Sequence, residues 1–186
     1  MGLFAVAQLM QTVFRNHSIL IRPFSTNDGP GLCSAARESI AELCAWMTWC
    51  SPTYSVAEAT AFVAQAGRDW ESGMRYCFAI AEAASGTLLG SIGLTQINQT
   101  HQFANVGVWV RTTRTSQGIA TEATRMLVRF AFEELRLRRL EFVVAAANLP
   151  SVRAVEKIGA KREGVLRQRL SLAGEVHDAF LYALVA

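Results

Sequence analysis

The stretch VGVWVRTTRTSQGIATEATRML, residues 106–127, decides the fold that this chain is expected to adopt. Alternating apolar residues up to Val110 predict a strand, and apolar residues at helical spacing between 118 and 135 predict an amphipathic helix. The helix opens on Ser116, Gln117 and Gly118, so its first turn is almost bare backbone. Because the first amides of a helix lack internal partners and carry a partial positive charge, this junction is expected to bind a phosphate or pyrophosphate group.

An ordinary helix start is the alternative interpretation of the same junction, with Gly118 needed only for a tight turn. The chain contains no G-x-x-x-x-G-K-[ST] phosphate loop and no G-x-G-x-x-G motif after a strand. The junction alone therefore leaves both interpretations open.

The remaining patterns predict strands and helices in a mixed order, typical of an α+β (mixed α/β) protein. Ser55 followed by Glu58 forms a capping box, which predicts a helix start. The three strands between 75 and 111 are expected to form an antiparallel meander, and the last two strands a hairpin around Ala173 and Gly174. The expected strands cover residues 18–25, 75–83, 87–97, 102–111, 139–147, 163–170 and 176–185. The expected helices cover residues 27–47, 55–72, 118–135 and 149–159.

One domain over residues 18–186 is expected, preceded by an N-terminal extension over residues 1–17. The extension has no Lys or Arg before Arg15 and no small-x-small cleavage site, so it predicts a short helical or frayed segment and no signal peptide. A hydrophobic content of 51% with 18% charged residues excludes a disordered protein. No apolar run reaches the roughly 18 residues that a membrane helix needs, so no membrane association is expected.

The cysteines indicate the cellular compartment, and the histidines and charged residues indicate which ligands the chain could bind. The four cysteines form no C-x-x-C pair, which favours reduced thiols in a cytoplasmic protein. The three histidines are too scattered to predict a metal site. Residues 111–186 hold 13 Lys and Arg against 8 Asp and Glu, whereas residues 1–110 hold 5 against 7. The basic second half fits a polyphosphate or a nucleic acid, and a solvated helix face is the alternative.

A second motif supports the phosphate interpretation. Residues 147–164, ANLPSVRAVEKIGAKREG, place Asn148, Ser151, Lys157 and Gly159 in order after a predicted strand. With TSQGIA at 115–120, which resembles the loop [Q/R]-x-x-G-x-[G/A], the chain resembles the GNAT superfamily of acetyl-CoA-dependent N-acetyltransferases. The branch that it resembles is that of the RimJ/RimL ribosomal-protein N-terminal acetyltransferases. LLGSIGLTQIN, ANVGVWV and GEVHDAFLYAL also resemble segments of that branch.

The resemblance implies a single GNAT-like domain. Its central sheet would be mostly antiparallel, have about seven strands, be splayed at a CoA cleft and be flanked by helices. The main-chain amides of residues 116–120 would hold the CoA pyrophosphate. Val108 and Val110 would run beside the pantetheine arm, and the Val110 amide would stabilise the oxyanion. The implied cofactor-binding residues are Val108, Val110, Arg114, Thr115, Ser116, Gln117, Gly118, Ile119, Ala120, Thr121, Asn148, Ser151 and Lys157.

The second motif would complete the catalytic set implied by the resemblance. Asn148 would contact the pantetheine arm and Lys157 would lie near the adenosine. Ser151 would sit near the thioester sulfur and donate a hydrogen bond or proton to the leaving thiolate. A position in the first turn of a helix, with no catalytic role, is the alternative for Ser151.

Three positions depart from the family pattern. Thr115 stands where the loop motif has Gln or Arg, and Arg114 comes one residue early. Val155 stands where many relatives carry a tyrosine acid, and Asn105 stands where many carry a glutamate base. A peptide α-amine has a pKa near 8 and hardly needs a base, so a missing glutamate fits an α-amine acceptor. The other candidates for the base are His101, Glu175, His177 and Asp178.

The acceptor pocket is expected to come from the early helices and the last hairpin. CAWMTWCSPTY, residues 44–54, supplies several large apolar groups that would line a groove or pack as helix core. Arg167 and Arg169 would face an acidic acceptor or solvent. The candidate substrate-binding residues are Trp46, Trp49, Tyr54, Asn105 and His177.

The expected reaction is acetyl transfer from acetyl-CoA to a primary amine by direct attack in a ternary complex. A protein or peptide N-terminal α-amine is the favoured acceptor. A small amine such as an amino acid, a polyamine, an antibiotic or a toxin is the alternative, and a non-catalytic acyl-CoA-binding module is the second. Direct nucleic-acid binding is not expected, because the basic half lacks aromatic-rich strands. No metal is expected, and the monomer and the homodimer both stay open.

Overall fold

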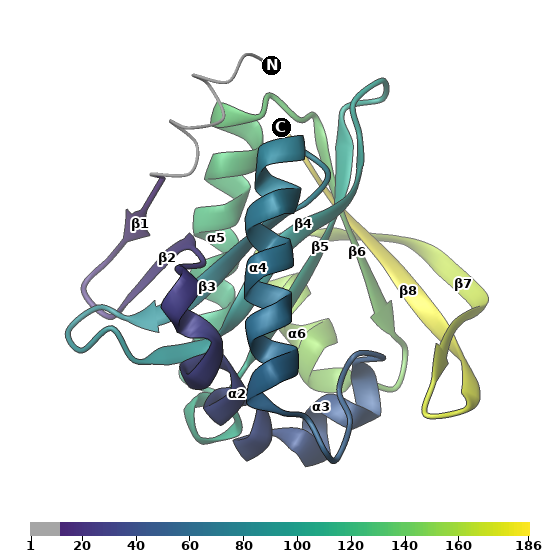
Figure 1. Ribbon diagram of the computed structural model, residues 1–186. Helices are drawn as coiled ribbons and strands as arrows, with labels where there is room; N and C mark the ends of the chain where they lie inside the picture. Colours follow the sequence, from purple (N-terminus) through teal and green to yellow (C-terminus); the bar gives the residue numbers. More distant parts are fainter. Residues whose placement is uncertain (1–11) are drawn as a thin grey trace.

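An eight-stranded sheet forms the frame of the structure (Figure 1). The computed structural model describes residues 12–186. The strands are β1 (Phe14–Arg15), β2 (Ile19–Pro23), β3 (Tyr76–Glu82), β4 (Leu88–Asn98), β5 (Phe103–Val110), β6 (Arg139–Ala145), β7 (Lys161–Leu172) and β8 (Glu175–Val185). The helices are α2 (Gly29–Glu38), α3 (Ile40–Trp46), α4 (Val56–Ser72), α5 (Ile119–Arg129) and α6 (Leu149–Lys157). The predicted α+β fold is confirmed.

The strands follow the spatial order β1-β2-β3-β4-β5-β6-β8-β7. All neighbours are antiparallel except β5 and β6, which run parallel. The predicted meander is therefore correct, as is the closing hairpin. Ala173 (φ 51°) and Gly174 (φ 85°) both adopt left-handed conformations at its turn, which suits the right-handed twist of the two strands.

Three local expectations differ from the structure. The helix expected over residues 27–47 is two helices, because Ser39 leaves helical geometry (φ −113°, ψ 15°) and its hydroxyl donates to the Ala35 carbonyl. Phe14 and Arg15 form a strand against β2 and add an eighth strand to the expected seven. The expected helical or frayed extension otherwise falls largely on residues 1–11, outside the described part. The helix from 118 onward ends at Arg129 and continues as a π-helical turn, Phe130–Glu134.

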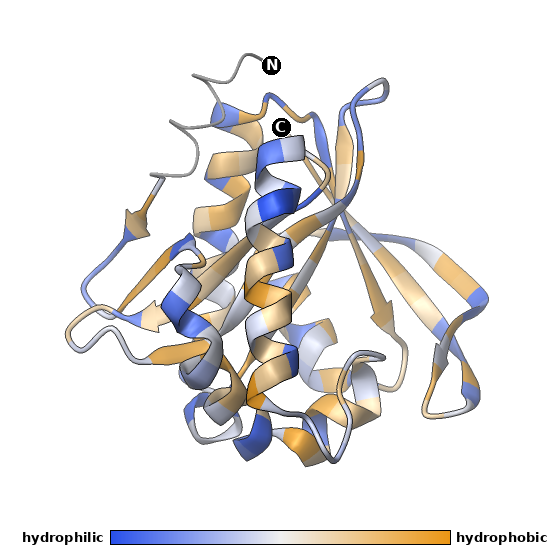
Figure 2. Ribbon diagram, viewed as in Figure 1, coloured by the Kyte–Doolittle hydropathy of each residue, from blue (hydrophilic) through white to orange (hydrophobic). Residues whose placement is uncertain are grey.

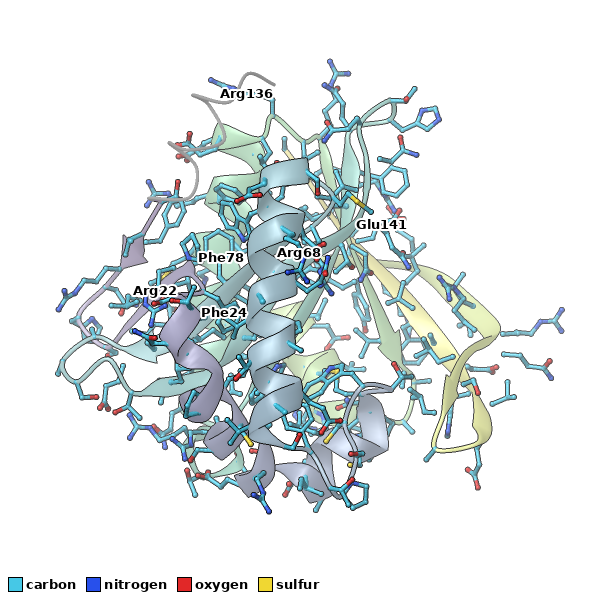
Figure 3. All side chains as sticks on the ribbon, in the orientation of Figure 1. Arg22, Phe24, Arg68, Phe78, Arg136 and Glu141 are labelled. Atoms are coloured by element: carbon cyan, nitrogen blue, oxygen red, sulfur yellow. The ribbon has the colours of Figure 1, made fainter. Side chains whose placement is uncertain are left out.

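Helices cover both faces of the sheet, and β3 supplies apolar residues to both layers. In Figure 1, α4 lies in front of the strands and α5 lies behind them. Phe78, labelled to the left of α4 in Figure 3, belongs to the buried cluster that includes residues of α5. Ala79 and Ala81 point to the opposite face and join the cluster formed with α2 and α4. Figure 2 accordingly shows the central strands as mostly hydrophobic.

Phe130 lies at the centre of the larger cluster. It is fully buried, and its ring centroid lies 5.1 to 6.3 Å from those of Phe14, Trp70, Tyr76 and Phe78. These edge-to-face and tilted contacts connect β1, β3 and α4 to the end of α5. The segment 115–118, which is expected to help bind a pyrophosphate, is called the phosphate-loop candidate below. The helix that follows it, α5, is therefore fixed to the sheet at its far end.

We expect Phe130→Ala to lower the free energy of unfolding by about 3–5 kcal/mol, because it leaves a cavity among four aromatic rings. Urea unfolding followed by circular dichroism measures the change. Met74→Ala is the control, since Met74 is 71% exposed and its loss should change stability by no more than about 0.5 kcal/mol. Similar values for the two variants would contradict this account of the core.

Candidate active site

The parallel strands β5 and β6 are joined at one end only. Their pairing ends at Asn105 opposite Glu141. β5 continues along β4 to Val110, and β6 continues along β8 to Ala145. The two strands therefore diverge beyond Asn105 and leave a wedge-shaped gap near the middle of the sheet. This is the splay that the resemblance implies.

β5 presents a backbone edge to this gap. The Arg111 amide donates to the Leu89 carbonyl of β4 at 2.7 Å. Because backbone groups alternate in direction along a strand, the amide of Trp109 also faces β4. The amides and carbonyls of Val108 and Val110 consequently face the gap, where an extended ligand could pair with them. Their side chains pack on the cluster that includes residues of α5.

The loop after β5 reaches α5 with open amides. Ser116 (φ 60°) and Gly118 (φ 79°) adopt left-handed conformations, and Gly118 is the N-cap of α5 without a side-chain cap. The Glu122 amide makes the first helical bond, to the Gly118 carbonyl, so the amides of residues 119–121 have no partner within the helix. A Cβ added at Gly118 would meet no atom within 4 Å. This helix start can therefore accept an anion.

Arg114 and Thr115 hold the loop from its N-terminal side. The Arg114 guanidinium pairs with Glu82, and its Nε atom is buried with no hydrogen-bond partner in the described chain. The Thr115 hydroxyl donates to a carbonyl of the preceding turn at 2.9 Å. Arg114, Gln117 and Ile119 line a cleft of about 290 Å³ beside the loop. Thr115, at the first position of the loop motif, thus stabilises the turn by its hydrogen bond, whereas Arg114 borders the cleft.

The α2–α3 junction grips the turn that precedes this loop. The Glu38 carboxylate accepts hydrogen bonds from the Arg111 guanidinium and from the amide (3.1 Å) and hydroxyl (2.5 Å) of Thr113. Ser39 accepts a hydrogen bond from the Thr112 amide at 2.9 Å. The bonds from Arg111 and then Thr113 lower the pKa of Glu38 to about 2. Residues some seventy positions apart thereby fix the phosphate-loop candidate from outside.

Asn148 and Ser151 open α6, the helix that follows β6. The Asn148 Oδ1 atom caps the helix by accepting the Ser151 amide at 3.2 Å. Ser151 is half-buried, and no protein partner binds its hydroxyl within residues 12–186. Lys157 is exposed in the last turn. Val155 is buried in the core, so the position where the resemblance expects a tyrosine supplies no acid.

Three aromatic rings meet on the face of the sheet that α2 and α4 cover. Trp49 is 42% exposed, and its ring centroid lies 5.8 Å from Trp109 of β5 and 5.4 Å from Tyr54. Tyr54 is buried in the core, and burial raises its pKa to about 12. Of the aromatic residues expected in the acceptor groove, Trp49 is thus exposed, and Tyr54 is buried against it. Trp46, the last residue of α3, is half-exposed.

Two sulfurs bracket the turn that carries Trp49. The Cys44 and Cys50 Sγ atoms lie 3.2 Å apart as free thiols. Burial, and then the neighbouring Cys44, raise the pKa of Cys50 to about 12. A thiol with so high a pKa is protonated at neutral pH.

Asn105 occupies the strand position where the resemblance expects a glutamate. Its Nδ2 atom lies 3.4 Å from the Thr95 hydroxyl, and its Oδ1 atom is buried without a hydrogen-bond partner among the described residues. A neutral carboxamide cannot act as a general base, yet its oxygen can accept a hydrogen bond from an N–H group.

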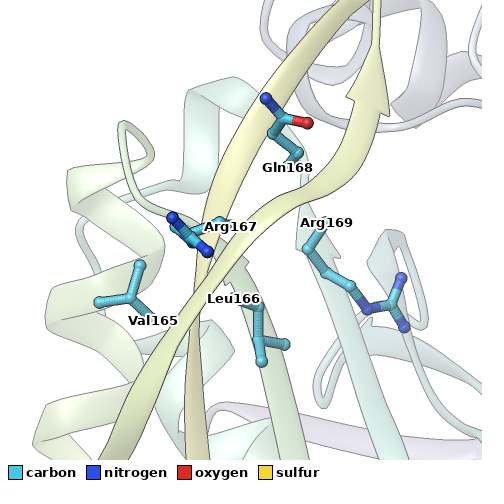
Figure 4. Close-up of a pocket in the computed structure, with 5 residues that line it drawn as sticks. All are labelled: Val165, Leu166, Arg167, Gln168 and Arg169. Atoms are coloured by element: carbon cyan, nitrogen blue, oxygen red, sulfur yellow. The ribbon is translucent and has the colours of Figure 1, made fainter.

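His177 lies on β8, beside an irregular part of β7. Residues Val165–Arg169 of β7 line a cleft of about 630 Å³ (Figure 4). The strand bulges there, because three residues of β7 lie opposite the single residue Asp178. The Asp178 carboxylate accepts a hydrogen bond from the main-chain amide of Gln168 at 2.8 Å. In Figure 4, the Arg167 and Arg169 side chains point in different directions from the strand. His101 lies in the β4–β5 turn, at the closed end of the gap, so the structure does not support it as the base.

The structure therefore brings the two motifs to the gap and adds residues that the sequence analysis missed. The phosphate-loop candidate follows one arm of the gap, and Asn148 follows the other. Trp109 was missed, although alternation places it opposite Val108 and Val110 on the strand. Glu38 was missed because no sequence signal connects it with Thr113.

Two kinds of feature are absent from the described residues. Residues 12–186 contain no group of three or more His, Cys, Asp or Glu side chains placed to hold a metal ion. None of their helices has the length and apolar character needed to cross a membrane.

Comparisons with known proteins agree with this geometry. The family described as "Acetyltransferase (GNAT) domain" matches residues 18–161. "Probable N-acetyltransferase YjcK" of Bacillus subtilis is 29% identical over 177 residues, covering 93% of this chain and 97% of that protein. "Putative ribosomal N-acetyltransferase YdaF" of the same organism is 37% identical over 100 residues, covering 54% of this chain and 55% of that protein. Mycobacterium smegmatis RimJ, solved in complex with CoA-disulfide, shares the fold at a TM-score of 0.87 and 24% identity, over 94% of this chain and 87% of that one.

The contribution of Glu38 to stability should depend on pH. Its pKa is about 2 in the folded protein and near 4.5 in the unfolded chain, so the contribution is complete above pH 4.5 and is lost as the pH falls through 2. We expect the difference in unfolding free energy between the wild type and Glu38→Gln to be constant from pH 8 to 5 and to shrink below pH 4.5. Urea unfolding at each pH measures it.

Hydrogen exchange provides the local readout for the same variant. Glu38→Gln should accelerate exchange of the Thr113 amide, which donates to Glu38, and leave the Val63 amide of α4 unchanged. Unchanged protection of the Thr113 amide would show that the hydrogen bonds of Glu38 do not hold the turn.

Proposed function

The chain belongs to the GNAT acetyltransferase family and is an N-acetyltransferase, and from this premise we propose that it acetylates the α-amine of a protein or peptide N-terminus. The acetyl group would come from acetyl-CoA, and both substrates would be bound before transfer. One observation carries the binding of acetyl-CoA in this proposal: the free edge of β5 leads, through the loop over residues 111–118, to the open amides at the start of α5. A ligand with an extended amide-containing arm and a pyrophosphate matches both features.

Different residues around the gap would bind different parts of CoA. The amides of residues 116–120 would take the pyrophosphate, with Thr121 completing the first turn of the helix. Val108 and Val110 would pair with the pantetheine arm, Asn148 would contact it and Lys157 would lie near the adenosine. Support comes from RimJ, which has the same fold and was solved with CoA-disulfide. Hydrogen bonds to a charged phosphate contribute about 1.5–3 kcal/mol each, so several amides suffice for useful affinity.

The catalytic residues would act by positioning and by hydrogen bonding. Holding the amine and the thioester together removes most of the entropic barrier to their reaction. The Val110 amide faces the gap and would donate to the developing oxyanion. Ser151 would donate a hydrogen bond to the departing thiolate, which needs little help because a thiol has a pKa near 8.5. The proton that the amine loses on forming the amide would pass to water. The unpartnered oxygen of Asn105 would accept a hydrogen bond from the attacking amine.

An α-amine acceptor is favoured by the chemistry at Asn105. A carboxamide there cannot remove a proton, so the acceptor should reach the site partly neutral, as an amine of pKa near 8 does. The name of YdaF, "Putative ribosomal N-acetyltransferase", points in the same direction. A small-molecule amine is the second candidate, because the exposed Trp49 would suit a compact apolar acceptor as well. A module that binds CoA without catalysis is the third.

Cellular location and assembly belong to the same proposal. Four free cysteines support the cytoplasm, where thiols stay reduced. A homodimer stays a prediction for which sedimentation would be the test.

A CoA-release assay with acetyl-CoA tests the function directly. The panel comprises peptides with free and blocked N-termini, polyamines, aminoglycosides and amino acids. Turnover that requires a free peptide α-amine supports the proposal, whereas turnover of small amines alone contradicts it in favour of the second candidate. CoA binding without any turnover would favour the non-catalytic module.

Gly118→Glu should reduce CoA affinity by at least about 100-fold, because it puts a carboxylate where the pyrophosphate would lie. Isothermal titration with CoA measures the affinity. Gly174→Glu is a matched control, since Gly174 (φ 85°) also has open space around it but lies at the β7–β8 turn. Equal CoA affinity in the Gly118 variant and the wild type would remove this loop from the site.

Ser151→Ala should lower kcat by about 100-fold, within the range for a positioned acid, and leave CoA affinity unchanged. The helix should survive, because its cap uses the Ser151 main-chain amide and not the hydroxyl. Steady-state kinetics and CoA titration provide the two readouts. Wild-type turnover would exclude Ser151 from the reaction.

A further inference from the structure

A glycine on an interior strand is uncovered on the face that α2 and α4 share. Gly107 is exposed, although β5 lies between β4 and β6 in the sheet. α2 packs on β4 and α4 packs on β3, one and two strands away. A Cβ built at Gly107 would meet no atom within 4 Å. The sheet therefore carries an open slot at this position.

Aromatic rings form one wall of the slot. Trp109 follows Gly107 by two residues, so it lies on the same face at about 7 Å along the strand. It packs against the cluster of α2 and α4, and the exposed Trp49 ring lies 5.8 Å from it. The two rings are tilted at 49° to one another, so the exposed Trp49 ring leaves apolar surface for a third group to cover.

A polar group marks the other end of the slot. Asn105 precedes Gly107 by two residues and shares its face, and its Oδ1 atom has no hydrogen-bond partner in the described part of the chain. A buried polar atom without a partner is uncommon in a native structure. The β5–β6 gap also opens immediately beyond Asn105, so the slot adjoins the edge where the thioester would lie.

We propose that Gly107, Trp109 and Trp49 form a specificity slot for the group attached to the acceptor amine, and that this group is apolar or aromatic. The inference rests on the proposed function in taking the substrate to be an amine acetylated at the β5 edge. The amine lies toward Asn105, and its neighbouring side chain fills the space over Gly107 against the tryptophans. For a peptide acceptor, this group is the side chain of the first residue. An apolar side chain gains more than a polar one from covering the tryptophan rings, because it gives up no hydrogen-bonded water to do so.

Gly107→Ala is the decisive variant, because its methyl group narrows the slot without disturbing the fold. Gly107 has no positive φ and its added methyl group has open space, so the thermal midpoint should be equal to or above that of the wild type. We expect at least a tenfold loss in kcat/KM for apolar amines with unchanged CoA affinity. Gly164→Ala is the matched control, since Gly164 also lies in a strand, β7, with open space around it and no positive φ.

The acceptor preference is measured with peptides that differ only in their first residue, phenylalanine, leucine, serine or aspartate, and with phenethylamine. Wild-type kcat/KM should be at least tenfold higher for the two apolar peptides than for the two polar ones. Trp49→Ala should bring this ratio toward one. Equal rates for all four peptides, or wild-type rates in Gly107→Ala, would overturn the slot while leaving the acetyltransferase function intact.

Two further outcomes separate the slot from the function. Acetylation of phenethylamine but of no peptide would support the slot and contradict a protein N-terminus as acceptor. If no amine reacts, titration of phenethylamine into the CoA complex decides. Weaker binding to Gly107→Ala than to the wild type supports the slot, and equal or undetectable binding overturns it.

Discussion

The separation of β5 from β6 is the constraint on which the rest of the molecule depends. A sheet is stable because its backbone groups pair, yet here pairing stops at Asn105 while both strands continue. β4 holds the outer side of β5, and β8 holds the outer side of β6, so the divergence costs neither strand its other neighbour. The groups left facing the gap need a partner, and an extended ligand is the partner that fits a strand edge.

Each arm of the gap leads into a helix start. β5 ends in the loop to α5, whose first amides are open, and β6 ends at the Asn148 cap of α6. The alternation of β5 gives its two faces different tasks: Val108 and Val110 pack on the core, whereas Gly107 lies exposed on the other face. One strand thus separates the side proposed for CoA from the side proposed for the acceptor. The Glu38 contacts with Thr113 tie the helices of the acceptor side to the loop proposed for the pyrophosphate.

Strands and helices whose apolar residues recur at regular spacing could be predicted from the sequence. Their contacts with residues distant in the chain could not. Alternation predicted the central strands, and the Ser55–Glu58 capping box predicted α4, where both reciprocal bonds occur. The break at Ser39 was missed because the residues on both sides continue a helical pattern. Two contacts of the Ser39 hydroxyl accompany the break: it donates to the Ala35 carbonyl within the chain segment and accepts from the Thr112 amide across the fold, and only the second is a tertiary contact. In the structure, Asn148 caps α6, a role that the sequence analysis did not assign to it. Its contact with CoA stays a prediction.

By itself, the sequence determined the α+β class, the order of most elements and the family, because period, capping residues and motif spacing lie within short windows of chain. It also predicted an anion-binding helix start at Gly118, where the structure has an N-cap without a side-chain cap, and anion binding there stays a prediction. Only the tertiary structure decided where pairing between β5 and β6 stops, which aromatic rings are exposed and which carboxylate holds the loop. Those features join segments up to some seventy residues apart, and they are selected by packing across the whole sheet rather than by any local preference.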